Sequence, residues 1–300
     1  MKLKPFLKLI RLPNVITAAC NSLAGALCAG VGLNRWPDLL MLALSSMSIY
    51  TAGILWNDLF DLEEDRRERP SRPLPSGEVS VRLAWLISIL LAVIGVILAA
   101  LVSLKVGVLA IILLSVVFSY DRWTKKNALG PWNMGLCRGL NLALGLVVKP
   151  VARWGVLAVL GYSIYIAGVT YISRQETKTG ETKGLRQGFI LLIAGMAMVI
   201  AAMLLNSNRT IYGFDIQNDV PLLGGLFILI VLMKRLTTVW KTAFAEPRPE
   251  TIQNVVKTGI INLPLIDFAI VLAVAGPLAT IPIAILFSLA RLTARKLYTT

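Results

Sequence analysis

Residues 37–56 read PDLLMLALSSMSIYTAGILW, and residues 57–65, NDLFDLEED, follow them without a break. The first segment is long and apolar enough to cross a hydrocarbon core of about 30 Å as an α-helix, which takes roughly 20 residues. The second places five acidic side chains where that helix gives way to water. The two segments therefore predict a membrane helix with an acidic group at one end.

Similar apolar stretches recur along the whole chain of 300 residues, which is 56% hydrophobic and 15% charged, with a mean hydropathy of +0.73. This composition predicts one all-α integral membrane domain over residues 1–300. The predicted helices are 15–32, 37–56, 82–102, 106–119, 129–148, 154–173, 187–205, 221–240 and 258–275. Residues 277–290 either extend the last helix or turn back as a separate one, because Gly276, Pro277 and Pro282 interrupt the stretch. We therefore expect a bundle of nine helices, or ten.

The net charge of +14 is a signal of membrane topology. Lys and Arg collect in the cytoplasmic loops of membrane proteins. With a cytoplasmic N-terminus, the N-terminal arm and every second loop carry most of the 30 cations, and the opposite loops hold five. Those five are Arg35, Lys105, Lys149, Arg153 and Arg209. We predict a bacterial inner or organellar membrane protein with its N-terminus in the cytoplasm, in contact with anionic lipid and not with nucleic acid.

The absence of histidine and the location of the cysteines exclude several classes of functional site. There is no histidine, which excludes His-ligated haem, His-Glu-x-x-His metalloproteases and His-based triads. The three cysteines lie inside apolar segments, so neither a disulfide framework nor a zinc site is expected. They are Cys20, Cys28 and Cys137.

The acidic residues after position 56 share one side of a helix. At 100° of rotation per residue, Asn57, Asp58, Asp61 and Asp65 fall within an arc of about 100°. Carboxylates on one face repel one another unless a cation lies between them. Mg²⁺ prefers oxygen ligands and binds through one or two carboxylates and the phosphates of a substrate. The spacing therefore predicts a magnesium-bridged phosphate, and the alternative is a solvated helix end paired with the arginines of residues 66–69.

Three polar loops are predicted at the same end of the bundle. Residues 57–81 and 174–186 are separated by four predicted helices, and residues 121–127 lie between them on the same side. This spacing predicts two similar four-helix pseudo-repeats with a cytoplasmic cap.

The acidic string NDxxDxxxD over residues 57–65, followed by RPSRPLPSG at 69–77, resembles the first motif of the UbiA superfamily of intramembrane prenyltransferases. The likeness extends over most of the chain through RLPN at 11–14 and GPWNMGLCRGLN at 130–141. The residues of these motifs are most similar to those of the EboC-like branch of the superfamily.

The resemblance implies a role for each residue of the first motif. In this family the motif binds Mg²⁺ and the diphosphate of an isoprenoid donor. Asn57, Asp58 and Asp61 would then coordinate the metal or the diphosphate. Asp65 would bind metal or act as the base for the acceptor.

The second motif of the family, Asp-x-x-x-Asp, is altered in this chain. By position its acids correspond to Glu176 and Gly180, so the first is lengthened and the second is missing, although Glu181 follows one residue later. The change calls a second metal ion into question, and catalytic competence with it. Two lysines of this loop would neutralise diphosphate directly or simply mark the topology: Lys178 and Lys183.

Several polar residues lie within the predicted membrane segments. Arg138 is in the middle of a helix, where a charge costs roughly 2.5 to 3.5 kcal/mol. It either contacts diphosphate or acceptor in a cavity, or is held by Asp267 or Asn141. Asn14 and Asn21 either face the cavity or form interhelical hydrogen bonds. Asp267 is also a second candidate for the acceptor-side base.

The loop after the fourth helix and the segment after the acidic motif supply cations. Lys125, Lys126 and Arg72 are placed to hold diphosphate oxygens. Three aromatic residues are predicted to anchor the protein at the membrane interface, with a hydrogen bond near the site as the alternative for the first. They are Tyr120, Trp123 and Trp132.

Together these features predict a Mg²⁺-dependent enzyme that transfers an isoprenyl group from a prenyl diphosphate to an acceptor which the sequence does not identify. One alternative is a catalytically weakened relative that binds isoprenoid or lipid as a scaffold or exporter component. Another is a different Mg²⁺-dependent transferase acting on phospholipid.

Overall fold

The structure is a computed structural model that describes residues 7, 9–176, 182–206 and 216–298. These residues form helices and no strand. The α-helices are α2 (Leu12–Cys28), α3 (Trp36–Phe60), α4 (Leu62–Glu68), α5 (Val81–Val102), α6 (Leu104–Ser119), α7 (Gly130–Leu146), α8 (Arg153–Ser173), α9 (Lys183–Asn206), α10 (Ile216–Ala245), α11 (Pro249–Ile261), α12 (Leu263–Ala275) and α13 (Ile281–Tyr298). Three short turns join them: η1 (Leu33–Arg35), η2 (Tyr120–Thr124) and η3 (Leu278–Thr280).

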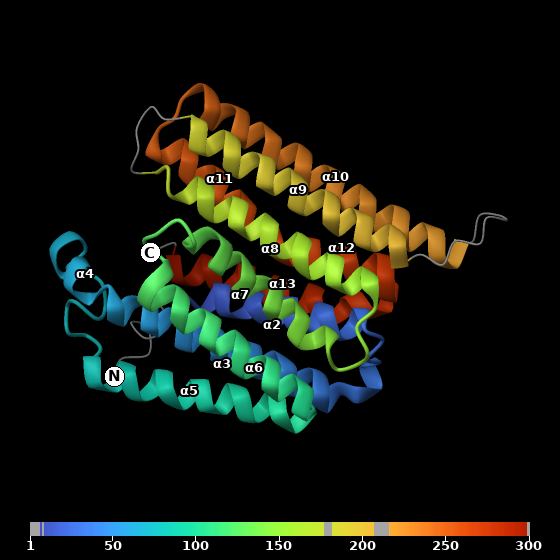
Figure 1. The fold of residues 1–300 in the computed structure, drawn as a ribbon, viewed down its shortest axis with the longest axis horizontal. Helices are drawn as coiled ribbons and strands as arrows, with labels where there is room; N and C mark the ends of the chain where they lie inside the picture. The colour runs from blue at the N-terminus through green and yellow to red at the C-terminus, as the bar shows by residue number, and fades with distance from the viewer. Residues whose placement is uncertain (1–6, 8, 177–181, 207–215, 299–300) are drawn as a thin grey trace.

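The long helices lie side by side in one bundle around α2 (Figure 1). α2 packs against α3, α7, α12 and α13, while α5 and α6 continue from α3 on one flank. On the other flank α8 packs against α7 and α9, and α10 packs against α11 and α12. The predicted all-α membrane bundle is confirmed.

Eight helical stretches of the described residues are long and apolar enough to cross a membrane. They differ in how deeply they lie in the protein: the apolar window of α3 is 67% buried, whereas that of α5 is only 22% buried. The exposed face of α5 consists of large apolar side chains that include Leu86, Ile89 and Leu90. An apolar surface of this kind suits contact with lipid tails.

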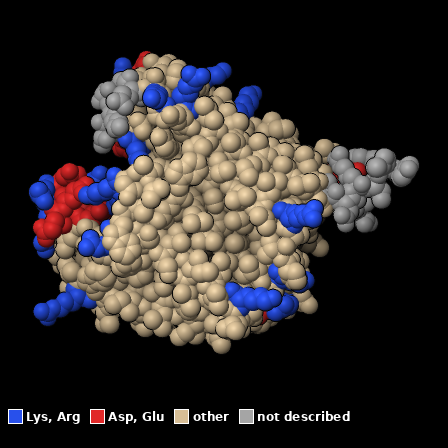
Figure 2. All heavy atoms as spheres, viewed as in Figure 1, with Lys and Arg blue, Asp and Glu red and all other residues tan. Residues whose placement is uncertain are grey.

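Charged side chains lie at the ends of the bundle, and a broad uncharged belt separates them (Figure 2). The acidic cluster visible on the left lies over α4 and the end of α3. Apolar helices with charges confined to their ends are the arrangement that a bilayer requires. The chain is therefore an integral membrane protein.

Two predicted segments differ in detail from the observed helices. The predicted helix 258–275 is divided into α11 and α12 at Asn262, and Pro264 lies in the first turn of α12, where proline is tolerated. Residues 277–290 do not extend that helix: the chain turns at Gly276, which has φ of 85°, and then forms η3 and α13. The number of crossings and the two-repeat layout remain predictions.

The closest contact between α2 and α7 depends on two glycines. A Cβ atom at Gly145 would lie 1.9 Å from the backbone oxygen of Ser22, and one at Gly25 would lie 2.1 Å from that of Leu142. Small residues allow membrane helices to approach closely and gain packing energy. This contact fixes α7, which carries Arg138, against α2.

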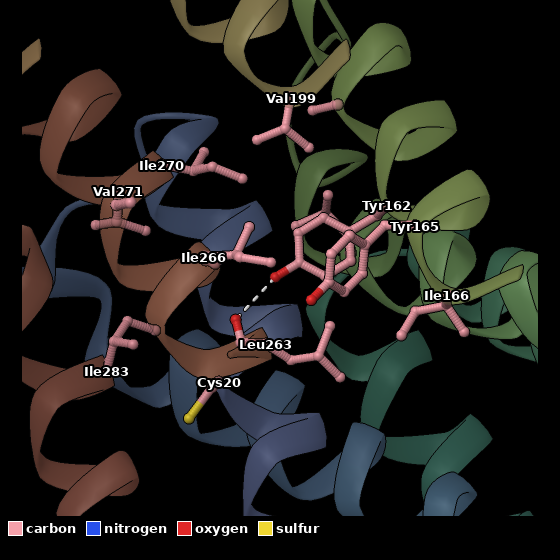
Figure 3. Packing of buried hydrophobic residues seen from close by; sticks show 14 of the residues in the cluster. Cys20, Tyr162, Tyr165, Ile166, Val199, Leu263, Ile266, Ile270, Val271 and Ile283 are labelled. Atoms are coloured by element: carbon pink, nitrogen blue, oxygen red, sulfur yellow. Dashed lines mark hydrogen bonds between the residues drawn. The ribbon is translucent and has the colours of Figure 1, made fainter. Parts of the chain in front are cut away.

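A buried polar group joins α2, α8 and α12. The Tyr162 hydroxyl has two acceptors for its single proton: the backbone oxygen of Leu263 at 3.0 Å, a bond drawn in Figure 3, and Asp267 Oδ1 at 2.5 Å. Asn21 Nδ2 also donates to Asp267 Oδ1, at 3.0 Å. Asn21 is thus an interhelical hydrogen-bonding residue, as one of its two predicted roles requires. Asp267 is fully buried at a helix junction and does not line the cavity beneath the acidic motif.

Candidate active site

The acidic motif lies where α3 ends and α4 begins. The helix is interrupted at Asp61, yet the hydrogen bonds from Asp61 N to the Asn57 oxygen and from Asp65 N to the Asp61 oxygen keep the helical repeat. Asp58 and Asp65 are 6% and 4% exposed. Burying a carboxylate is costly unless it is paired. These two residues are therefore not the solvated charges of an ordinary helix end.

Each buried carboxylate has its own guanidinium partner. Asp58 Oδ1 accepts hydrogen bonds from Arg11 Nη2 at 2.8 Å and from Asn57 Nδ2 at 3.2 Å. Asp65 Oδ2 accepts from Arg72 Nη1 at 2.6 Å. The same Arg72 nitrogen lies 4.0 Å from Asp58 Oδ1, so Arg72 joins the two ends of the motif.

Lys125 completes the motif from the turn that follows α6. Its Nζ donates to Asn57 Oδ1 at 2.8 Å and to Asp61 Oδ2. Asn57 and Asp61 thus direct oxygen atoms to one cationic atom. Lys125 and Arg72 lie at the motif, where the sequence predicted cations for a diphosphate.

Arg174 at the end of α8 holds the turn that carries Lys125. Its guanidinium donates to the backbone oxygen of Asn127 at 2.7 Å and to that of Lys125. A bidentate contact of this kind fixes orientation as well as position. The sequence analysis gave Arg174 no role, because a side-chain bond to backbone 47 residues away leaves no local pattern.

Arg11 is a second residue whose role the sequence did not reveal. It has φ of 50° and ψ of 53°, the left-handed region, and is the only non-glycine residue with positive φ in the described chain. This conformation costs a residue with a Cβ atom roughly 1 to 2 kcal/mol. The strain is accompanied by the Arg11–Asp58 bond, and strained residues concentrate at functional sites.

A cavity of about 140 Å³ lies directly beneath the motif, between α3, α6 and α7. Its outer end is lined by Arg11 and Asn57, and its inner end by Arg138 and Asn141. Most of the wall between them is apolar or aromatic: Ile49, Tyr50, Gly53, Ile54, Leu113, Val117, Tyr120, Met134 and Cys137. The apolar chamber thus meets the motif at Asn57, the one motif residue in its lining.

Arg138 lies in this chamber without a carboxylate partner among the described residues. Its guanidinium is over the Tyr50 ring, 4.8 Å from the centroid, and Nη2 is 3.5 Å from Thr17 Oγ1. The alternative to a ligand-binding role was an ion pair with Asp267 or a hydrogen bond to Asn141, and neither contact forms between these described residues. Asn141 instead binds α2 and α3, donating to Ala18 O and Asn21 Oδ1 and accepting from Ser46 Oγ.

Two other predicted residues lie outside the cavity. Lys126 pairs with Glu64 at the exposed surface, and this lysine lowers the pKa of the Glu64 carboxyl below its usual range. Asn14 is half-buried in the first turn of α2, where its backbone oxygen accepts from Thr17 Oγ1 at 2.7 Å. Neither lines the cavity.

The altered second motif is only partly described. Glu176 accepts a hydrogen bond from Gln253 Nε2 of α11, and no contact joins it to the first motif in the described residues. Lys178, Gly180 and Glu181 lie outside the described residues. Lys183 is exposed at the start of α9.

The three aromatic residues predicted to anchor the protein at the membrane interface lie in two different environments. Trp123 and Trp132 are 64% and 49% exposed, as interfacial anchors should be. Tyr120 lines the cavity instead. It therefore belongs to the site.

The oxygen donors at the motif suit magnesium only with help from a substrate. In the described residues, no three acidic, cysteine or histidine side chains lie close enough to hold one ion, so the predicted convergence of three carboxylates is wrong. The oxygens of Asn57 and Asp61 do converge on one cation, the Lys125 ammonium. Mg²⁺ often uses one or two carboxylates and substrate phosphates, so Asp58 and Asp61 fit a site that a diphosphate completes.

Comparison with known proteins agrees with this geometry. The UbiA prenyltransferase family matches residues 18–242. Digeranylgeranylglyceryl phosphate synthase of Sulfurisphaera tokodaii is 27% identical over 253 residues, which cover 78% of this chain and 87% of that protein. A relationship to the EboC-like branch is not confirmed, and neither is a bacterial or organellar membrane, since this relative is archaeal.

Solved structures share the fold. A structure reported for digeranylgeranylglyceryl phosphate synthase in membranes has a TM-score of 0.66 at 23% identity, covering 92% of this chain and 99% of that one. A UbiA homologue from Archaeoglobus fulgidus bound to DMAPP and Mg²⁺ has a TM-score of 0.62 at 16% identity, covering 89% of this chain and 98% of that one. With a family match over most of its length, the chain belongs to the UbiA prenyltransferase family.

Proposed function

We propose that this prenyltransferase moves an isoprenyl group from a prenyl diphosphate to an acceptor inside the membrane, with Mg²⁺ as cofactor. The observation that carries the proposal is that the cavity meets the acidic motif at Asn57. A diphosphate needs charge and oxygen-bound metal, whereas an isoprenyl chain needs apolar walls. The motif and the chamber offer these two environments side by side.

Residues of the motif would bind the head of the donor. Asn57, Asp58 and Asp61 would hold Mg²⁺, which supplies Lewis-acid stabilisation of the leaving diphosphate when it is bound. Lys125 and Arg72 are already paired with these acids, so they would shift only from carboxylate to phosphate oxygens. Three further residues stay predicted ligands: Lys126, Lys178 and Glu176.

The chamber would position the reacting carbon and exclude water. An allylic cation reacts with water, so an apolar wall protects the donor until the acceptor attacks. Arg138 at the inner end would hold an anionic or electron-rich group of the acceptor. The glyceryl phosphate in the name of the archaeal relative supports an acceptor with a phosphate and a hydroxyl.

The orientation follows from the charges. The site would face the cytoplasm, because its loops carry the larger share of Lys and Arg and the N-terminal arm lies on that side by the same rule. Water-soluble donor could then reach the motif directly. Asn14, at the start of α2, would lie close to this surface.

A lipid-binding scaffold is the second candidate. Its support is the altered second motif: Glu176 is bonded to Gln253, away from the first motif. A protein that binds prenyl diphosphate but no longer transfers the prenyl group would show this arrangement.

The test is transfer itself. The protein in lipid nanodiscs would be mixed with Mg²⁺, geranylgeranyl diphosphate and geranylgeranylglyceryl phosphate as the probe acceptor, and products followed by mass spectrometry. We expect the wild type to transfer the prenyl group and Asp61→Asn to reduce the transfer rate by roughly 100-fold or more. The control variant Glu63→Gln, which changes an exposed acid of α4, should leave the rate unchanged. Donor binding without transfer to this or other hydroxyl acceptors would favour the scaffold.

A further inference from the structure

We propose that Asp121 accepts the proton that the acceptor loses during transfer. The inference rests on the proposed function and adds a proton-accepting residue to the same site. Asp121 lies outside the segments that resemble the family motifs, residues 11–14, 57–65, 69–77 and 130–141.

Asp121 lies in a π-helical turn at the end of α6. η2 spans Tyr120–Thr124, and Lys125 N donates to the Tyr120 oxygen at 2.9 Å across five residues. A π-turn inserts one extra residue into a helix and changes the direction of the side chains around it, and such turns are frequent at functional sites. Here the turn allows Tyr120 and Asp121 to line the cavity while Lys125 reaches the motif.

Asp121 is buried but unpaired. It is 9% exposed, and no hydrogen bond or salt bridge joins it to a described residue, so the charges of Lys125 and Arg11 act on it only at longer range. The three motif aspartates differ in this respect, because each of them binds a lysine or an arginine. A buried carboxylate without a partner is costly, and such groups are candidates for chemistry.

The carboxylate lies at the boundary between chamber and motif. It lines the cavity between α3, α6 and α7 and also a second hollow, whose lining includes Phe60, Asp61 and Lys125. Gly53 of α3 lies beside the carboxylate, since a Cβ atom there would be 4.0 Å from Asp121 Oδ2. The carboxylate is therefore beside the place where the diphosphate head would meet the apolar chain.

No other described acid occupies this position. The cavity between α3, α6 and α7 is lined by a single acidic residue, Asp121, within the part of the chain that the structure describes. Asp65, for which the resemblance implied a base, is outside the lining and is bound to Arg72. Asp267 is fully buried among α2, α8 and α12.

The proposed reaction needs only the donor, the acceptor and Asp121. A hydroxyl oxygen of the acceptor forms a bond to C1 of the donor, and the bond between C1 and the diphosphate oxygen breaks. The diphosphate leaves with the electron pair, and the hydroxyl proton moves to an Asp121 oxygen. Arg138, at the inner end of the cavity, would hold the acceptor with its hydroxyl toward Asp121.

The test separates this step from donor binding. Asp121→Asn keeps the shape of the side chain but cannot accept the proton, and Glu63→Gln is the control at an exposed acid. Three quantities would be measured in nanodiscs: Mg²⁺-dependent binding of geranylgeranyl diphosphate, release of diphosphate without acceptor, and transfer to geranylgeranylglyceryl phosphate. General-base catalysis contributes roughly 10² to 10⁴-fold.

We expect Asp121→Asn to bind donor and to release diphosphate like the wild type, with kcat for transfer at least 100-fold lower and KM for the acceptor little changed. Asp121→Glu should recover part of the rate. Transfer by Asp121→Asn within threefold of wild type would overturn the proposal, and so would an equal loss of donor binding, which would place Asp121 in the donor site. If the wild type itself binds no donor, the proposed function fails together with this inference.

Discussion

Replacing Arg138 by methionine should abolish transfer without destabilising the protein. Arg138 is 8% exposed in the middle of α7, and its guanidinium has no carboxylate within salt-bridge distance among the described residues. Methionine has a similar length and no charge. If Arg138 serves a ligand rather than the fold, the fold should not need it.

The expected change in the free energy of unfolding follows from the contacts of Arg138. A charge in the middle of a membrane helix costs roughly 2.5 to 3.5 kcal/mol. Against this, Arg138 gains a cation–π contact with Tyr50, worth up to about 2 kcal/mol, and a long contact of 3.5 Å to Thr17 that contributes little. The difference predicts that Arg138→Met leaves the free energy of unfolding unchanged or raises it by about 1 kcal/mol.

A matched control lies three residues away on the same helix. Asn141 makes three buried hydrogen bonds. Each is worth about 1 kcal/mol, and their partners would be left unsatisfied, so Asn141→Leu should lower the free energy of unfolding by about 3 kcal/mol. Unfolding in mixed micelles would measure both variants, and the transfer assay would be run on the same samples.

The two outcomes are distinct. The reasoning is refuted if Arg138→Met is destabilised as much as Asn141→Leu, because the guanidinium would then be part of the fold. It is also refuted if Arg138→Met keeps normal stability and normal transfer.

Further predictions concern packing and surface charge. Gly145→Ala should lower the free energy of unfolding by more than about 3 kcal/mol, since its methyl group would meet the backbone of α2, whereas Gly224→Ala, whose nearest atom is a side-chain carbon at 3.2 Å, should change it by less than about 1 kcal/mol. Lys126→Met should raise the pKa of Glu64 toward its usual value of about 4.3, measured by carbon-13 NMR titration. Because Lys126 lowers that pKa, the stabilising effect of the pair is present above the usual value and is lost as the pH falls through the lowered one. An unchanged Glu64 titration would show that the pair does not form.

Helix positions could be predicted because hydropathy alone determines which segments enter a membrane. The predicted helix 154–173 corresponds to α8, Arg153–Ser173, almost residue for residue. The break at Asn262 was missed, although Pro264 was a visible signal, because the hydropathy of the segment is continuous across it.

The motif could be predicted, but its electrostatics could not. Helical spacing correctly placed Asp58 and Asp65 together with Asn57 at one end of α3. It could not show that Arg11 and Lys125, from distant parts of the chain, would each neutralise one acid. Pairing between distant residues depends on tertiary structure and leaves no periodic pattern.

Asp121 illustrates the same limit. In the sequence it is the single acid of the loop DRWTKKN at 121–127, in which three of the seven residues are cations. The predicted site residues of this loop were therefore two of its cations, Lys125 and Lys126. Its position in the cavity follows from the π-turn, which has no residue pattern that would identify it.

The central claim is that the acids hold a metal that holds a diphosphate. Its most direct test is calorimetric binding of geranylgeranyl diphosphate to the purified protein with and without Mg²⁺, in parallel with the Asp58→Asn/Asp61→Asn double variant. The account predicts binding by the wild type that requires Mg²⁺ and is lost in the double variant. Binding that is equally strong without Mg²⁺, or that persists in the double variant, would contradict it.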